Sequence, residues 1–355
     1  MANPENIYRC ILSPGIVEIR SNTKFMLGGY ALNFSPEKAL QSKPSSKICI
    51  TSLVSNNIPH RQPYADTHFF WVHGKFGEDV LYYDRTFFRL VNTRLELKGL
   101  RHNPTITVNT SYNKFVRIRT NLLFPFGTFV RDVLSTQLLM QDYGAIHGAA
   151  CGISNEGILI IGLPGIGKST VLFDVLKQGF QYITEDMMLV DSDGYLHSCP
   201  GASSFAYDIR RTEARYQTSK MEFLSNKWKT LLAKTQLSIF LDWPYMDILS
   251  FFPQVEPITH VKPRYIFILA KGNRHIGKLS AAEAVRMLIA VNRHTFAYQE
   301  NDLLFEYSLL NPWLNLSELM QTEERLLGKI VNSSTCFLCT APEPHDFFTL
   351  MQQKF

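Results

Sequence analysis

Residues 157–186 decide the fold of this chain, and they read GILIIGLPGIGKSTVLFDVLKQGFQYITED. The first five residues form a continuous apolar run, which is typical of a short strand buried on both faces. Residues 170–178 have a helical pattern that stops at Gly179, and residues 180–184 are again typical of a strand. A strand, a loop, a helix and a second strand in this order predict a mononucleotide-binding α/β core.

The loop between the first strand and the helix carries two glycines five residues apart, Gly162 and Gly167, followed by Lys168 and Ser169. This is the phosphate-binding loop pattern, in which glycines let the backbone N–H groups turn toward a phosphate at the helix N-terminus. The lysine neutralises β- and γ-phosphate oxygens, and the serine hydroxyl can bind Mg²⁺. A chance Gly-rich turn is the alternative, but the flanking strand and helix favour a nucleoside triphosphate site. The predicted nucleotide-binding residues are Gly162, Pro164, Gly165, Ile166, Gly167, Lys168, Ser169 and Thr170.

Two acidic residues, Glu185 and Asp186, follow the second strand. Because parallel neighbouring strands end at the same edge of a sheet, we expect these carboxylates near the terminal phosphate. One carboxylate can accept the proton of an attacking hydroxyl while the other binds a metal ion, directly or through water. The predicted metal ligands are therefore Ser169, Glu185 and Asp186, and a solvated acidic turn is the alternative.

Residues 187–198 follow the acidic pair and predict a hairpin that turns at Ser192, Asp193 and Gly194. This detail separates the chain from small-metabolite kinases resembling shikimate or gluconate kinase. Those enzymes begin with the loop near residue ten and continue from the acidic residue into a helix. Here the loop lies beyond residue 160, and a hairpin follows.

The same motifs resemble the catalytic domain of HPr kinase/phosphorylase, a phosphate-loop fold related to phosphoenolpyruvate carboxykinase. His147, within Ile146-His147-Gly148, lies 22 residues before Ser169 (169 − 147), and Asp186 lies 17 residues after it (186 − 169). These intervals match the family, and Glu185-Asp186 corresponds to its Asp-Asp pair. The resemblance covers residues 144–198; beyond them only the order of elements is similar.

The resemblance implies roles for individual residues. Asp186 would be the general base for a serine or threonine hydroxyl, Lys168 a clamp on the transition state, and Ser169 a metal ligand. His147 would help to position the phosphate or the acceptor, so the predicted catalytic residues are Asp186, His147 and Lys168. A core histidine bonded to backbone is the alternative for His147.

Two departures from the bifunctional bacterial enzymes bear on the substrate. Residues 201–215 lack the Glu-rich metal segment that those enzymes carry after their base, and residues 1–126 differ in kind from their N-terminal domain. The layout is more similar to stand-alone HPr-kinase-like enzymes that phosphorylate a serine in a peptide, including the tailoring kinases of lasso and related ribosomal peptides.

The rest of the chain predicts a β-rich N-terminal domain over residues 1–126 and an HPr-kinase-like phosphate-loop domain over residues 127–355, hence an α/β fold. A helix that starts after Gly127 and ends before Gly144 is expected to join the two. Strands are predicted at residues 16–20, 47–53, 67–74, 79–84, 105–109, 115–124, 264–270 and 336–340. Helices are predicted at residues 216–236, 279–294 (capped by Ser280), 316–330 and 345–353.

Four weaker signals have an ordinary alternative. Residues 237–242 resemble a Walker B strand, but Trp243-Pro244 favours a turn. An arginine group at residues 210–215 can contact phosphate or start a solvated helix. Arg117 and Arg119 share a face if residues 115–124 form a strand. Cys336 and Cys339 point to opposite faces of a strand, which favours structural thiols over a zinc site.

The composition excludes several classes of protein. With 355 residues, 45% hydrophobic and 19% charged, the chain can bury one or two cores, so it is not intrinsically disordered. The 36 basic and 31 acidic residues give a net charge of +5, which is too mild to predict a nucleic-acid partner. The six cysteines predict a reduced, cytoplasmic chain, and no apolar run is long enough to predict secretion or a membrane span.

Together these patterns predict an ATP- and Mg²⁺-dependent kinase whose acceptor is a serine or threonine hydroxyl in a peptide or protein, including a ribosomal peptide precursor. A nucleotide-gated regulatory protein without transfer and a small-molecule hydroxyl kinase are the alternatives. The patterns do not distinguish ATP from GTP as the phosphate donor. They predict neither whether the reverse phosphorolysis occurs nor whether the chain forms a homo-oligomer.

Overall fold

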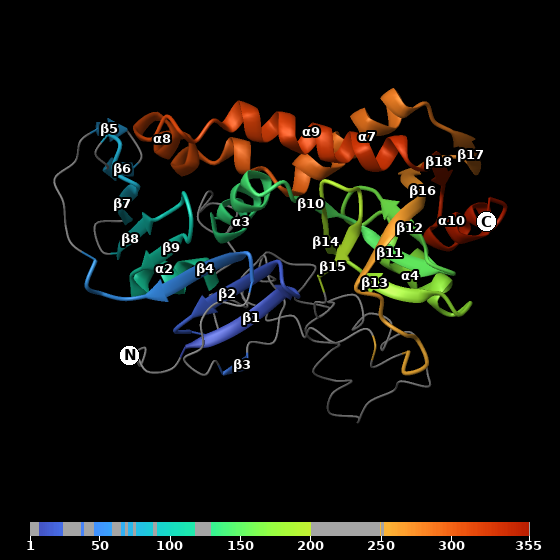
Figure 1. Ribbon diagram of the computed structural model, residues 1–355, viewed down its shortest axis with the longest axis horizontal. Coiled ribbons are helices and arrows are strands. Elements are labelled where there is room, and N and C mark those ends of the chain that lie inside the picture. The colour runs from blue at the N-terminus through green and yellow to red at the C-terminus, as the bar shows by residue number, and fades with distance from the viewer. Residues whose placement is uncertain are drawn as a thin grey trace.

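The structure is a computed structural model of the 355-residue chain. It describes residues 7–23, 37–38, 46–58, 65–67, 70–73, 76–87, 91–117, 129–199, 249 and 252–354. Two mixed β-sheets with helices packed around them make an α/β fold, which confirms the predicted class. Figure 1 shows the first sheet on the left of the view, the second on the right, and helices α8, α9 and α7 along the top of both.

The first sheet has the strand order β3-β1-β2-β4-β9-β8-β7-β6-β5. Strands β2, β4 and β9 run parallel to one another, and the other neighbouring pairs are antiparallel. The strands are β1 (Tyr8–Ser13), β2 (Val17–Ser21), β3 (Glu37–Lys38), β4 (Ile48–Val54), β5 (Ala65–Thr67), β6 (Phe70–His73), β7 (Val80–Phe87), β8 (Val91–Lys98) and β9 (Thr105–Val108).

The second sheet has the strand order β10-β14-β15-β16-β12-β11-β13, with β18 beside β16 and β17 beside β18. Strands β12, β16 and β18 are parallel, as expected for a buried core that helices cover on both faces. The strands are β10 (Gly144–His147), β11 (Ala149–Ile153), β12 (Glu156–Ile161), β13 (Gln181–Thr184), β14 (Met187–Val190), β15 (Leu196–Ser198), β16 (His260–Lys271), β17 (His275–Lys278) and β18 (Thr335–Ala341).

Helices cover the two faces of the second sheet. Helices α4 and α10 pack together on one face, and α7 and α9 pack together on the other, where α3 joins them. Helix α2 lies against β8, and α8 lies against β7. The helices are α2 (Thr110–Arg117), α3 (Phe129–Met140), α4 (Lys168–Leu176), α7 (Ala281–Thr295), α8 (Asp302–Leu310), α9 (Leu316–Asn332) and α10 (Pro344–Met351), with a 3₁₀ turn, η5 (Tyr298–Glu300).

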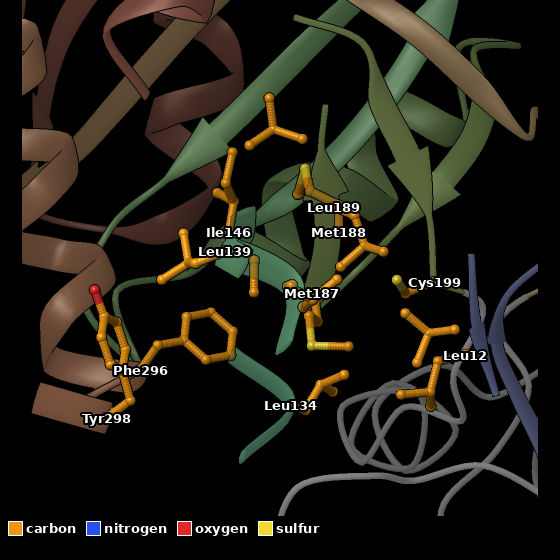
Figure 2. Packing of buried hydrophobic residues seen from close by; sticks show 14 of the residues in the cluster. Leu12, Leu134, Leu139, Ile146, Met187, Met188, Leu189, Cys199, Phe296 and Tyr298 are labelled. Atoms are coloured by element: carbon orange, nitrogen blue, oxygen red, sulfur yellow. The ribbon is translucent and has the colours of Figure 1, made fainter. Parts of the chain in front are cut away.

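Two hydrophobic clusters hold these layers. The larger one is continuous from the first sheet, through α3, to β10, β14 and helices α7 and α9. Figure 2 shows part of it, with Leu12 of β1, Leu134 of α3 and Met187 of β14 in one packed group. The smaller cluster lies between the second sheet and helices α4 and α10. The first sheet therefore shares its core with one face of the second sheet, while the other face has a core of its own.

Most elements predicted from the sequence are present. The hairpin after Asp186 is β14–β15, the joining helix is α3, and Ser280 caps α7 with a capping box to Glu283. Cys336 and Cys339 of β18 enter different clusters, as the strand period predicts. All six cysteines are buried and free, and burial raises the pKa of Cys336 to about 11 and that of Cys339 to about 12.

Three expectations are corrected. The run predicted as a strand from residue 115 begins as helix α2, so Arg117 is helical; this apolar run is too short for its period to separate strand from helix. Strand β13 is not the direct neighbour of β12, because β11 lies between them. Strands β1 and β8 and helix α8 were not predicted.

Several predictions fall on residues outside those described. They are the helix at 216–236, the Walker B-like run at 237–242, the arginines at 210, 211 and 215, and Arg119. No helix among the described residues is both long enough and apolar enough to cross a bilayer.

Candidate active site

The predicted phosphate-binding loop lies between a strand and a helix, as the sequence pattern predicts. Strand β12 ends at Ile161, the loop occupies residues 162–167, and α4 begins at Lys168. Gly165 and Gly167 have φ angles of +79° and +112°, which side chains with a Cβ rarely adopt. No described residue lies within 4 Å of the place where a Cβ of Gly165 would stand.

The loop also depends on the far end of the chain. A Cβ on Gly167 would stand 2.7 Å from Cβ of Pro344, the first residue of α10. Only glycine permits this close approach, so the C-terminal helix buttresses the start of α4. Ile166 packs on the smaller hydrophobic cluster and anchors the tip of the loop.

Lys168 is buried and curls back over its own loop. Its Nζ donates hydrogen bonds to the carbonyl oxygens of Gly162 (2.8 Å) and Leu163 (3.3 Å). Burial lowers the pKa of Lys168 to about 8, although the negative charges of Asp186 and Glu185 act in the opposite direction. The amine thus lies close enough to both predicted acidic residues for their charges to act on it, and an anionic ligand would raise its pKa further.

The acidic pair lies at a break between two bent strand pairs. The β10–β14 pairing ends with His147 opposite Met187. The β11–β13 pairing begins with Ala150 opposite Thr184. Gly148 joins β10 to β11, and residues 185–186 join β13 to β14, with Gly148 N–H donating to the Asp186 carbonyl (3.0 Å). Such irregularities re-aim side chains and are frequent at active sites.

Gly148 is required at this break. A Cβ there would stand 2.6 Å from Ile161 Cδ1 and 2.8 Å from the Ile160 carbonyl oxygen, at the end of β12. The missing side chain lets the break approach the start of the phosphate-binding loop. Two segments predicted separately, Ile146–Gly148 and the loop, thereby come into contact.

His147 and Asp186 form a pair at the break. Nδ1 of His147 donates to Oδ1 of Asp186 at 3.2 Å, with the imidazole buried and 71% of the Asp186 side chain exposed. Surrounding protein desolvates the carboxylate and raises its pKa, but the His147 hydrogen bond and the charges of His147, Lys168 and Arg131 outweigh that effect. The pKa of Asp186 therefore lies below its ordinary value, and the group is ionised at neutral pH.

The other ring nitrogen of His147 faces the protein interior. Nε2 is buried and has no hydrogen-bond partner among the described residues. When Nδ1 carries the proton, Nε2 is an acceptor that a water molecule or a hydroxyl group can satisfy. Among the described residues, the imidazole of His147 is therefore bonded to a carboxylate at Nδ1, and its catalytic role stays a prediction.

The structure therefore brings together four of the residues predicted from the sequence: His147, Lys168, Glu185 and Asp186. Ser169 and Thr170 are half-buried in the first turn of α4. Among the described residues, no three His, Cys, Asp or Glu side chains gather as a metal site. Magnesium sites in phosphoryl-transfer proteins commonly use one or two carboxylates together with substrate phosphates, so this donor set suits Mg²⁺ only with a bound nucleotide.

Sequence reasoning missed two residues near the site. Arg131 of α3 lies close enough for its charge to lower the pKa of Asp186, and its guanidinium lies over the Phe296 ring at 5.8 Å. Asn292 of α7 accepts a hydrogen bond from the His147 backbone N–H at 3.1 Å. Neither belongs to a local motif, so no signal in the sequence pointed to them.

Comparison with known proteins finds one family of curated relatives. The chain is 28% identical to an HPr kinase/phosphorylase of Clostridium beijerinckii over 111 residues, which are 30% of this chain and 35% of that protein. It is 32% identical to the enzyme of Lachnoclostridium phytofermentans over 69 residues, 19% of this chain and 22% of that protein. The chain is similar to HPr kinase/phosphorylases.

The extent of this HPr kinase-like similarity is limited. The matched stretches span about a third or less of the curated relatives, and no family model matches the chain. A solved structure of the HPr(Ser) kinase/phosphatase from Coxiella burnetii aligns with 59% of this chain and 94% of its own, at 12% identity and a TM-score of 0.25.

Proposed function

We propose that the protein is an ATP- and Mg²⁺-dependent kinase that transfers the γ-phosphoryl group to a serine or threonine hydroxyl of a peptide or protein. The observation that carries the proposal is the His147–Asp186 pair beside Lys168 of the phosphate-binding loop. A carboxylate next to a phosphate-loop lysine is what hydroxyl phosphorylation needs, and the similarity to HPr kinase/phosphorylases supports the same chemistry.

The loop and Lys168 bind the phosphates. The backbone N–H groups of residues 162–167 and the N-terminus of α4 would surround the β-phosphate. Lys168 would exchange its bonds to the Gly162 and Leu163 carbonyls for phosphate oxygens, and the negative phosphates would keep its amine protonated.

The residues at the site fit a magnesium ion. The Ser169 hydroxyl and the carboxylates of Glu185 and Asp186 supply hard oxygen ligands, the kind that Mg²⁺ prefers. When bound, the ion neutralises charge on the phosphates during transfer.

Asp186 would orient the acceptor hydroxyl. A carboxylate with a lowered pKa is a weak base, so it accepts the proton as the bond to phosphorus forms rather than beforehand. His147 would fix the direction of the carboxylate through its Nδ1–H. Arg131, close to Asp186, would add positive charge where the transferred group becomes most negative.

In this proposal residues 127–355 form the catalytic domain, and residues 1–126 form a β-rich domain that contributes to recognition of the peptide, including a ribosomal peptide precursor. The cytoplasm, where ATP and Mg²⁺ are abundant, is the compartment that suits the reaction. The proposed role of residues 1–126 in peptide recognition is tested by acceptor binding, which is measured independently of nucleotide binding.

The test is transfer of labelled phosphate from ATP in the presence of Mg²⁺ to a panel of serine- and threonine-containing peptides, proteins and small hydroxyl compounds. Asp186→Asn should abolish transfer and preserve ATP binding, whereas Asp193→Asn, in the exposed hairpin turn, should change neither. Labelling of a free amino acid or sugar alone would identify a small-molecule kinase instead. ATP binding without transfer to any acceptor would identify a nucleotide-gated regulatory protein and reject the proposal.

A further inference from the structure

Strand β10, which carries His147, is an edge strand. Among the described residues it pairs with β14 on one side and with no strand on the other. Its open edge faces α7 and α9, which pack against it. The polar backbone groups on that edge are buried, so they need partners.

Asn292 supplies these partners with a single side chain. Its Oδ1 accepts from the His147 backbone N–H (3.1 Å), and its Nδ2 donates to the Ala145 carbonyl (3.0 Å). In a parallel sheet, a residue that lies beside residue i of the next strand makes the same two bonds. Its N–H donates to the C=O of residue i−1, and its C=O accepts from the N–H of residue i+1. The amide of Asn292 therefore acts as one residue of a parallel strand placed next to Ile146.

Asn292 is held in this orientation by other buried groups. Its Nδ2 also donates to Oε1 of Glu323 (2.7 Å), and both side chains are almost wholly buried. Oε2 of Glu323 accepts from Arg293 (3.2 Å) and Tyr298 (3.4 Å). Because the carboxylate can only accept, it dictates which end of the Asn292 amide carries the N–H groups and which end faces His147.

We propose that Asn292 is a positioning residue that replaces the missing neighbour strand along β10 and thereby holds His147 against Asp186. The inference rests on the proposed function for its catalytic meaning. His147 pairs with Met187 on one edge of β10 and bonds to Asn292 on the other, so Asn292 would act on the reaction through His147.

The first experiment needs no acceptor. Asn292→Ala is compared with Asn311→Ala, which removes another fully buried asparagine, at the end of α8, away from β10. Hydrogen exchange of a peptide spanning residues 144–148 should accelerate in Asn292→Ala only. The carboxyl ¹³C titration of Asp186, assigned with Asp186→Asn, should move to higher pH in Asn292→Ala, because the hydrogen bond from His147 is weakened.

The second experiment measures transfer. Asn292→Ala should lower kcat about tenfold or more, the size typical of removing a group that orients a functional histidine, with the Kd for ATP little changed. In a His147→Gln background the same substitution should have almost no further effect on kcat, because the two residues act as a unit. Asn292→Ser, which leaves room for a water molecule, serves if the alanine variant does not fold.

An Asp186 titration that is the same in Asn292→Ala and the wild type overturns the proposal, as does an additive effect on kcat in the double variant. Absence of transfer by the wild type to every acceptor rejects the proposed kinase function instead. In that case hydrogen exchange and the Asp186 titration still decide whether Asn292 positions His147.

Discussion

The two faces of the second sheet contribute to the site in different ways. The loop side, with β12, the predicted phosphate-binding loop and α4, comes from one stretch of about twenty residues. Among the described residues, Pro344 of α10 approaches this loop at Gly167 and Leu269 of β16 approaches it at Gly162. The base side, with His147 and the larger cluster, depends on α3, α7, α9 and the first sheet. The predicted phosphate-binding loop is thus built mainly from one local stretch, whereas the position of Asp186, the proposed base, depends on contacts between distant parts of the chain.

The largest expected effect is the loss of phosphoryl transfer in Asp186→Asn, which changes the base side and leaves the loop side intact. Asp186→Asn keeps the shape of the side chain but removes its proton acceptor. Phosphoryl transfer should fall by about 10³-fold, within the range for loss of a general base. ATP affinity, measured by calorimetry, should stay within a few fold. A parallel loss of ATP affinity would show that the base side also builds the nucleotide site.

On the loop side, Lys168→Ala should weaken binding and transfer together. Loss of charge-assisted bonds to phosphate costs about 1.5–3 kcal/mol, so ATP affinity should drop by about tenfold to a hundredfold. Equilibrium binding of a fluorescent ATP analogue measures this loss. Unchanged affinity would mean that Lys168 stays bonded to the Gly162 and Leu163 carbonyls when nucleotide binds.

The contact between the two sides can be tested at Gly148. A methyl group there meets Ile161 and the Ile160 carbonyl, so Gly148→Ala should destabilise the fold by about 1–3 kcal/mol, as overpacking does. Chemical denaturation gives the value. The matched control is Gly328→Ala in α9, where no described residue lies within 4 Å of the added Cβ and the helix should gain about 0.5–1 kcal/mol. Equal stability of both variants would mean that the break and the loop do not touch.

The smallest effect is a pH dependence confined to the loop side. The pKa of Lys168 is lowered from 10.5 to about 8, so its positive charge is present below pH 8 and is lost as the pH rises through that value. ATP affinity should fall about tenfold between pH 7 and pH 9, since one tenth of the amines stay protonated at pH 9. Lys168→Arg, whose guanidinium stays charged, should bind ATP with no such decline. A flat profile in the wild type would contradict the burial of the amine.

The loop side was predictable because its signals are local. Gly162, Gly167, Lys168 and Ser169 stand next to a strand and a helix that the apolar pattern already indicates. The hairpin after Asp186 was also predictable, from Asp193-Gly194. The prediction that β13 lies directly beside β12 was wrong. Strand β11 lies between them, although β12 and β13 run in the same direction.

Arg131 and Asn292 could not be predicted, because each takes its meaning from a partner more than fifty residues away in the chain. Nothing near either residue in the sequence distinguishes it from an ordinary residue of a helix. Only packing of α3 and α7 against the second sheet brings them to the break between β10 and β11.

Sequence patterns suffice to predict the glycine-containing loop at residues 162–167, the strand and helix around it, and a carboxylate soon after. These follow from backbone freedom at glycine and from apolar periodicity, which act over a few residues. That the carboxylate of Asp186 meets His147, and lies close enough to Lys168 for their charges to interact, follows only from long-range packing. That meeting requires two bent strand pairs, a glycine without room for a methyl group, and a buried asparagine on a distant helix, and such long-range contacts leave no periodic trace in the sequence.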